Sequence, residues 1–402
     1  MERKMPEKHS GLELLFPEYV RIADRFFQRV YSPVAKGYVY IPRDKRELKA
    51  DGIAVDNPDV VKRFHGFTNE LSHHNYRFDV NGFFNLYEYI EREAIAGGYP
   101  TIMRFLEHIF GNQIGLALDY FTLLWRMPTQ LLPILVLVSK EQGTGKTSFL
   151  HFAELLFGAN AIILNVSQYV QQFNGIYASK LVICIDETAV KEDFIKERLK
   201  QDSTASEINL RRMHMEFQKI PFFGKFILAT NKEDSFARLE NEDGRFWVRK
   251  VPVLEEFDPD FFEKLTAEIP AFIYDLDRRE ITAPNSSRQW FSPEQIRTDA
   301  FDVVVENSKS ECAQDLKLWI QETINEKGAF GATITELWEA LGRRHGRNAI
   351  TRALRDELGY KAPEAPHYYK PLIGDKRTGR AYLFGAESVE TAVDYDDPDL
   401  PF

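Results

Sequence analysis

The chain has 402 residues, of which 44% are hydrophobic and 28% are charged, so disorder is excluded as its dominant state. No run of about 20 apolar residues occurs, and two cysteines exclude both a disulfide scaffold and a zinc site built on clustered cysteines. The net charge of −10 leaves nucleic-acid binding open, because six acidic residues lie in the last 16 positions, where no Lys or Arg occurs.

The first 95 residues mix helical and strand-like patterns. Leu12–Val30 has helical spacing and many aromatic residues, which predicts a helix, whereas Gly37–Ile41 reads as a short strand. His73 and His74 are adjacent, which suits a shared metal poorly. No pair of acidic residues on an apolar strand indicates a primase or polymerase site here, so we expect an accessory module.

The next part of the chain predicts an α/β core. Two helices are expected in residues 96–128, and the Pro at position 128 ends the second. Residues 129–255 alternate buried strands with helices, and residues 256–306 are mostly helical.

Residues 308–385 predict a separate small domain. Three amphipathic helices are followed by a hairpin with its turn at GDKRTG and its second arm at Arg380–Phe384. This order is typical of a winged-helix domain, and the alternative is a plain helical cap.

The segment ILVLVSKEQGTGKTSF carries the strongest chemical signal. An apolar run suited to a buried strand leads into a glycine-rich loop and then a helical pattern. Gly143 and Gly145 let the backbone wrap a phosphate, because no Cβ blocks the approach. Lys146 would reach the β- and γ-phosphates of ATP, and Thr147 would ligate Mg²⁺. Lys140 stands where this motif normally has its first glycine. The predicted ATP-binding residues are Gln142, Gly143, Thr144, Gly145, Lys146, Thr147 and Ser148.

Two further apolar strands end in polar side chains. LVICIDE ends in Asp186 and Glu187, and FILATN ends in Asn231. Asp186 would hold Mg²⁺ directly or through water, and Glu187 would polarise the attacking water. Asn231 can hydrogen-bond the γ-phosphate or that water. Each signal is weak by itself, and their order after Lys146 makes the set specific.

The segment DGRFWVRK places Arg245 between an acidic loop and an apolar strand. Phosphoryl transfer needs positive charge on the transition-state oxygens, and an Arg from a neighbouring subunit often supplies it. Arg245 is therefore the predicted arginine finger, with Arg238 and Arg249 as the other candidates. The alternative for Arg245 is a salt bridge within the chain.

Residues 208–220 predict a hairpin, because apolar and polar residues alternate on both sides of a basic turn at Arg211–Met213. Such a tip suits phosphate contacts in a pore, and the alternative is a solvated charged turn. The predicted DNA-binding residues are Arg211, Arg212, His214 and Lys219.

Four segments resemble the signatures of superfamily 3 helicases, and more closely those of the phage and plasmid primase-associated helicase family. In chain order they are SKEQGTGKT, QFNGIYASKLVICIDE, FILATN and DGRFWV. The resemblance spans residues 96–255. It implies an AAA+-like ring, usually a hexamer, that binds ATP with Mg²⁺ between subunits and translocates on single-stranded DNA, typically 3′ to 5′. Carried over by residue, it assigns the ATP motifs to Lys146, Thr147, Asp186, Glu187 and Asn231, the arginine finger to Arg245, and the DNA hairpin to Arg211, Arg212 and His214.

The expected fold class is α/β, a P-loop AAA+-like ATPase core with an N-terminal helical region and a C-terminal winged-helix domain. The expected domains are an accessory module (1–95), a helical oligomerisation collar (96–128), the ATPase core with its helical extension (129–306), the winged helix (307–386) and an acidic tail (387–402).

The expected function is an ATP-dependent DNA helicase or translocase that replicates a phage, plasmid or integrated mobile element. It would act in the cytoplasm of a bacterial host cell, without a membrane, and with a separate primase. One alternative is an origin-binding or regulatory DNA-binding protein that uses ATP as an assembly switch, without processive unwinding. Another is a small-molecule kinase, which would leave the cationic hairpin unexplained.

The C-terminal segment DYDDPDLPF resembles the acidic tip of bacterial single-stranded-DNA-binding proteins. The resemblance implies docking on host replication proteins that read that tip. The contacts would come from Asp396, Asp397, Asp399, Leu400, Pro401 and Phe402. The alternative is an acidic solubilising tail.

Overall fold

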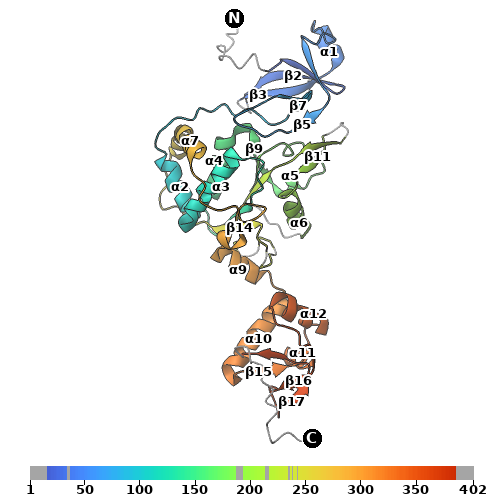
Figure 1. Ribbon diagram of the computed structural model, residues 1–402, viewed down its shortest axis with the longest axis vertical. Helices are drawn as coiled ribbons and strands as arrows, with labels where there is room; N and C mark the ends of the chain where they lie inside the picture. Colours follow the sequence, from blue (N-terminus) through green and yellow to red (C-terminus); the bar gives the residue numbers. More distant parts are fainter. Residues whose placement is uncertain are drawn as a thin grey trace. The chain divides into compact units, whose positions relative to one another are not determined.

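A computed structural model describes residues 16–33, 37–186, 193–212, 217–233, 236–237, 239–241 and 243–385 (Figure 1). The chain divides into two compact units, residues 1–305 and 306–402. Within the described ranges, no helix is both long and apolar enough to cross a membrane.

The N-terminal module is built mainly from strands. Its elements are β1 (Tyr19–Ile22), β2 (Arg25–Ser32), β3 (Gly37–Arg43), α1 (Lys45–Ala50), β4 (Val61–Phe64), β5 (Phe67–Thr68), β6 (Asp79–Val80) and β7 (Phe83–Asn85). They form one sheet in the order β3-β2-β1-β4 and a second in the order β5-β7-β6.

The predicted strand at Gly37–Ile41 is confirmed within β3, but the predicted helix over Leu12–Val30 is wrong in its described part, where β1 and β2 lie. The side chains of β1 alternate between half-buried and buried, the period of a strand with one covered face. β1 pairs antiparallel with β2 and parallel with β4, so its hydrogen bonds go to both neighbours. The expected N-terminal helical region therefore begins only at residue 100, apart from short α1.

The two helices predicted in residues 96–128 are confirmed as α2 (Pro100–Phe110) and α3 (Ile114–Arg126), joined by the 3₁₀ turn η2 (Gly111–Gln113). Their buried side chains are largely aromatic and aliphatic, and they pack in one cluster with α4 (Lys146–Phe157) and with α7 (Phe261–Arg278). This cluster covers one face of the central sheet. Figure 1 shows the helices α2, α4 and α7 close together.

The central sheet has the strand order β14-β8-β13-β10-β9, and all neighbouring strands are parallel. Its elements are β8 (Ile134–Val138), α4 (Lys146–Phe157), η3 (Gly158–Asn160), β9 (Ala161–Asn165), α5 (Val166–Tyr169), β10 (Val182–Asp186), α6 (Asp193–Asp202), β13 (Lys225–Thr230) and β14 (Phe246–Lys250). All side chains of β8 and β13 are buried, as expected for strands covered on both faces. The predicted alternation of strands and helices is confirmed.

Between α6 and β13 the chain forms the predicted hairpin, with β11 (Glu207–Leu210) antiparallel to β12 (Gln218–Pro221). After β14 the chain is mostly helical, as predicted, with α7 followed by α8 (Pro293–Ile296) and α9 (Asp299–Asn307).

The second unit contains the three predicted helices followed by a hairpin. Its elements are α10 (Glu311–Lys327), β15 (Phe330–Ala332), α11 (Ile334–Ala340), α12 (Arg347–Arg352), the π-helical turn η4 (Ala353–Glu357), β16 (His367–Tyr369), β17 (Arg377–Gly379) and β18 (Tyr382–Phe384). The hairpin consists of β16 and β17, whereas Arg380–Phe384, predicted as its second arm, contributes β18 to a pair with β15. Phe384 is buried 5.0 Å from the ring of Phe330, so apolar burial explains this pairing.

Candidate nucleotide-binding site and hairpin

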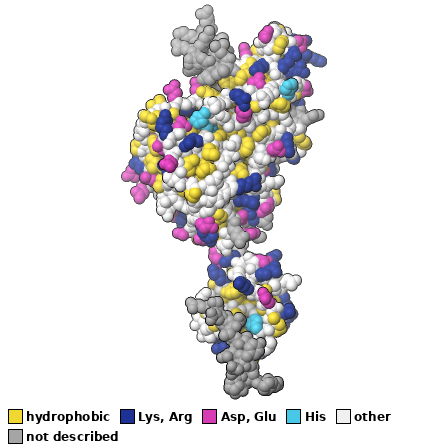
Figure 2. Space-filling view, in the orientation of Figure 1, with side chains coloured by type: hydrophobic (Ala, Val, Ile, Leu, Met, Phe, Trp, Pro, Cys, Tyr) yellow, Lys and Arg dark blue, Asp and Glu magenta, His cyan; other side chains and the backbone are white. Residues whose placement is uncertain are grey.

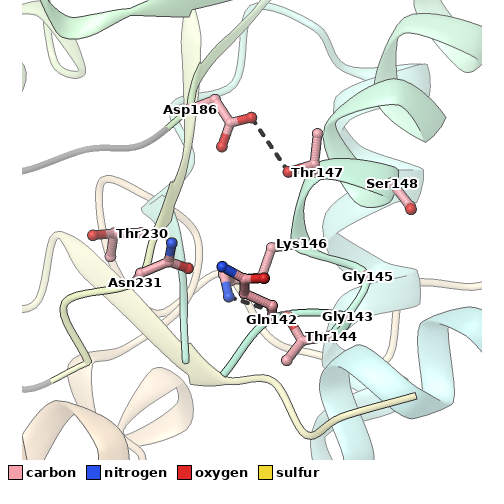
Figure 3. A pocket seen from close by; sticks show the side chains of 10 residues that line it. All are labelled: Gln142, Gly143, Thr144, Gly145, Lys146, Thr147, Ser148, Asp186, Thr230 and Asn231. Carbon is pink, nitrogen blue, oxygen red and sulfur yellow. Dashed lines mark hydrogen bonds between the residues drawn. The ribbon is translucent and has the colours of Figure 1, made fainter. Parts of the chain in front are cut away.

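A cavity of about 340 Å³ lies where the carboxyl ends of β8, β10 and β13 meet at one edge of the central sheet (Figure 3). Crevices at this edge are the usual ligand sites of open α/β sheets. The cavity is lined by Gln142, Gly143, Thr144, Gly145, Lys146, Thr147, Ser148, Asp186, Thr230 and Asn231. The structure therefore brings together all seven predicted ATP-binding residues with Asp186 and Asn231.

The loop between β8 and α4 depends on its glycines. Gly143 and Gly145 have φ angles of 67° and 88°, in the left-handed region that other residues avoid. A Cβ on Gly145 would lie 3.2 Å from the ring of Phe105, which leaves little room for a side chain. The twelve-residue helix α4 begins directly after Gly145, so its first backbone amides face the cavity.

The ammonium group of Lys146 is buried in this loop. Its Nζ donates to the carbonyl oxygens of Ser139 and Glu141, both at 3.3 Å, and to the hydroxyl of Thr144 at 3.1 Å. Burial lowers the pKa of Lys146, and the nearby carboxylates of Asp186, Glu141 and Glu233 oppose that shift. A positive charge is thus held at the cavity by negative neighbours.

Asp186, which ends β10, and Asn231, which follows β13, lie across the cavity from the glycine-rich loop. The Thr147 hydroxyl donates to Asp186 Oδ2 at 3.3 Å, and Figure 3 shows both side chains at the same side of the cavity. The side chain of Asn231 points into the cavity from the end of β13, whereas the Ser148 side chain points away. Glu187 lies outside the described residues. The hard oxygen atoms of Thr147 and Asp186 are of the type that Mg²⁺ prefers.

Arg245 does not lie at this edge. It is exposed and directly precedes β14, whose Phe246 is level with Ile134 at the start of β8. The glycine-rich loop leaves the other end of β8, about 13 Å away at the usual rise per strand residue. Gly244, the residue before Arg245, has no room for a side chain, because a Cβ there would lie 2.5 Å from Pro293 Cγ.

Of the other two candidates for the arginine finger, the structure describes only Arg249. Arg249 is held within the chain: it donates to the Phe110 carbonyl at 2.6 Å and to Gln113 Oε1 at 2.9 Å, and so caps the end of α2. Burial lowers its pKa. Arg238 lies outside the described residues.

The predicted DNA-binding residues lie at different places on the hairpin. Arg211 and Arg212 follow β11 and are half-buried, and His214 lies outside the described residues. Lys219 on β12 forms an ion pair with Glu207, with Nζ and Oε2 2.5 Å apart. Lys219 is therefore paired within the hairpin.

Sequence reasoning missed Asn174, which fixes the base of the hairpin. Its side chain is buried, donates to the Asn209 carbonyl at 2.9 Å and accepts from the Arg211 amide at 2.8 Å. Asn174 lies in the segment QFNGIYASK, and the Asn-Gly pair between a helix and a buried strand was the available signal.

Acidic and basic side chains are interspersed on the face drawn in Figure 2. Even near α1, where dark blue side chains gather, Lys45 and Lys49 both lie within 4 Å of Asp56. In the described part of the chain, no cluster of three or more His, Cys, Asp or Glu could hold a metal. The tail residues Asp396, Asp397, Asp399, Leu400, Pro401 and Phe402 lie outside the described residues.

Comparison with known proteins identifies the fold. A family of unknown function (DUF5906) matches residues 137–249, from the end of β8 through most of β14. No curated protein matches the sequence significantly. The apo structure of the NrS-1 C-terminal region (305–718) is similar over 92% of this chain and 95% of that chain, with a TM-score of 0.64 and 14% identity. An A-form apo structure of the same region covers 91% and 95%, with a TM-score of 0.63 and 15% identity.

A structure of JCV helicase bound to a small molecule is similar over 58% of this chain and 66% of that chain, at 10% identity. Its TM-score of 0.31 is too low to carry an argument. The likeness to the NrS-1 region shows a shared mixed α/β fold over nearly the whole chain.

Proposed function

We propose that this protein is an ATP-dependent DNA helicase or translocase that works as a ring, with a hexamer as the expected form. The observation that carries the proposal is the cavity in which the glycine-rich loop, Lys146, Asp186 and Asn231 meet at one sheet edge. A chance glycine turn would not be met there by a carboxylate and an amide from two other strands.

The chemistry of the residues that line the cavity suits a nucleoside triphosphate with Mg²⁺. The amides at the start of α4 and Lys146 would hold the phosphates, and Thr147 and Asp186 would hold the metal ion. Bound MgATP would supply the phosphoanhydride bond whose hydrolysis releases the free energy for movement. Asn231 would orient the γ-phosphate or the attacking water, and Glu187 would accept the proton of that water.

A ring explains the position of Arg245. An exposed Arg at the amino edge of the sheet is far from its own cavity, but it is free to approach the cavity of a neighbouring subunit. The residues that would complete the site then come from two copies of this chain, which makes assembly a condition for hydrolysis.

The remaining partners are proposals from the sequence. Single-stranded DNA would contact the β11–β12 hairpin, and the second unit would act as a winged helix that binds duplex DNA. A separate primase would supply primers, and the acidic tail would dock on host replication proteins.

Unwinding of a forked DNA duplex tests the proposed function. The full chain with ATP and Mg²⁺ is expected to release the labelled strand, and Lys146→Ala is expected to release none while still forming rings. ATP-dependent DNA binding with no strand release at any protein concentration would instead favour an ATP-switched origin-binding protein. If the protein shows no ATP-dependent DNA binding and no strand release, both readings are contradicted.

A further inference from the structure

Two hydrogen bonds reach the glycine-rich loop from residues outside the cavity lining. His108 on α2 has its Nε2 3.0 Å from the Thr144 carbonyl oxygen, and the Leu254 amide, after β14, donates to the Gly143 carbonyl at 3.1 Å. Because a carbonyl oxygen can only accept, His108 donates through Nε2. Neither His108 nor Leu254 lines the cavity. The two bonds therefore draw two consecutive carbonyl groups of the loop away from the cavity.

The direction of a carbonyl group fixes the direction of the next amide in the chain. In a trans peptide unit the C=O and N–H bonds point opposite ways, and no described peptide bond is cis. The amides of Thr144 and Gly145 are therefore turned toward the cavity side. Neither of them donates to a backbone carbonyl among the described residues. Adjacent amides turned to one side, in a loop with left-handed glycines, form a concave arrangement that binds anions.

Helix α2 holds His108 in a fixed position, because both ends of the helix are bonded to the core. At its start, the amides of Thr101 and Ile102 donate to the Glu268 carboxylate at 3.1 and 2.9 Å. At its end, Arg249 donates to the carbonyl of the last helical residue at 2.6 Å. The loop, in contrast, contains glycines, which have the widest backbone freedom of all residues. The helix therefore restrains the loop.

We propose that His108 is a positioning residue for the phosphates of the nucleotide. Its hydrogen bond to the Thr144 carbonyl keeps the Gly145 amide turned toward the cavity, and His108 itself does not contact the nucleotide. The position of α2 thereby regulates the affinity of the cavity for the triphosphate. The inference deepens the proposed function and rests on it, because it requires ATP to bind in this cavity.

The loss of this hydrogen bond would free one peptide unit of the loop. Gly145 tolerates both signs of φ, so the peptide between Thr144 and Gly145 could rotate and turn its carbonyl oxygen toward the phosphates. A partly negative oxygen there would repel the anion, and binding would first have to turn the peptide back. A donor that fixes the peptide in advance removes this cost from nucleotide binding.

Binding of ATP and of ADP to the full chain, measured by equilibrium dialysis, tests this role. His108→Phe keeps a ring but removes the donor, and it should weaken both nucleotides about 2- to 12-fold, because a typical hydrogen bond contributes ~0.5–1.5 kcal/mol. The two losses should be similar, since the loop amides contact the α- and β-phosphates, which both nucleotides carry. His108→Gln retains an N–H donor and should restore most of the affinity.

Steady-state ATP hydrolysis gives a second readout. His108→Phe should raise KM by a similar factor and leave kcat unchanged, because it removes binding that the ground state and the transition state share. The matched control is His151→Phe, the same substitution at a histidine of α4 that pairs with Glu154 and does not line the cavity. This control should bind and hydrolyse ATP as the wild type does.

Three results would overturn the inference while leaving the helicase proposal intact. One is equal ATP affinity in His108→Phe and the wild type. Another is an equal loss in His108→Phe and His108→Gln, which would assign the effect to packing of the ring. The third is a lower kcat with unchanged nucleotide affinity. If the wild type binds neither ATP nor ADP, both the inference and the proposed function are wrong.

Discussion

The Thr147 hydroxyl lies 3.3 Å from the Asp186 carboxylate, although 39 positions separate these residues in the sequence. They meet across β13, because β8 and β10 are both parallel neighbours of that strand and end at the same edge. Asn231 directly follows β13, the strand that lies between β8 and β10. The order of three strands thus assembles one polar site from distant segments.

The position of Asp186 makes a clear prediction for the next residue. Glu187→Gln should bind ATP as tightly as the wild type but lose hydrolysis, because only activation of water is damaged. Nucleotide binding by fluorescence titration and phosphate release measure the two properties separately. Glu197→Gln on α6 also neutralises one carboxylate, on an exposed side chain away from the cavity, and is the matched control. Normal hydrolysis by Glu187→Gln would show that another group activates water.

Arg245→Ala should bind ATP normally but hydrolyse it slowly in every homogeneous ring. If Arg245 acts on the neighbouring subunit, a mixture of Arg245→Ala with Lys146→Ala should regain hydrolysis, because some interfaces pair an intact loop with an intact arginine. Phosphate release across mixing ratios measures the recovery. Rings that form at every ratio and never regain hydrolysis would indicate a role for Arg245 within its own chain.

The basic residues of the second unit are not equivalent. Arg347 and Arg343 both lie over the Trp338 ring, 4.6 and 4.7 Å from its centroid. Arg355 instead pairs with Asp356, and Arg377 is bonded to Glu336 and Tyr369, so both of these basic side chains are engaged within the unit.

Replacing both Arg347 and Arg352 with Ala should therefore weaken duplex binding by the full chain. The salt slope should fall by about 0.9 per lost phosphate contact. Arg355→Ala is the control and should change the slope little. Unchanged duplex affinity in the double variant would favour protein docking by this unit.

The sequence predicts the residues that line the cavity because they lie at or shortly after the ends of three apolar strands, and parallel strands end at one edge. It does not predict how the strands of the N-terminal module pair. Tyr19 on β1 pairs with Val61 on β4, which lies far along the chain, and no local pattern reveals that pairing. The contact between Arg212 and Phe67, in which the guanidinium lies 4.6 Å from the ring centroid, was equally hidden, because Phe67 lies far earlier in the chain. Local periodicity carries no signal for such contacts.

His73 predicts a pH dependence of stability. Its ring stacks 4.4 Å from Trp125, its Nδ1 lies 2.7 Å from the Tyr87 hydroxyl, and burial, followed by repulsion from His74, lowers its pKa to about 4. Below about pH 6.5 the unfolded chain binds a proton that the folded protein accepts only near pH 4. Stability should therefore fall as the pH drops through this window, by up to about 3 kcal/mol.

Thermal unfolding midpoints between pH 7 and pH 4 measure this slope. His73→Phe should flatten it, whatever its midpoint at pH 7, and His74→Asn should keep most of it. An equal slope in His73→Phe and the wild type would assign the pH dependence to other groups.

The most direct test of an ATP-driven DNA motor is ATP hydrolysis with and without single-stranded DNA, compared between Lys146→Ala and Lys140→Ala. Both variants remove one positive charge from the same loop, but only Lys146 lines the cavity. We predict that DNA stimulates hydrolysis by the wild type and by Lys140→Ala, whereas Lys146→Ala falls to background in both conditions. Hydrolysis by Lys146→Ala at the wild-type rate, or a wild type that hydrolyses no ATP even with DNA, would contradict the account.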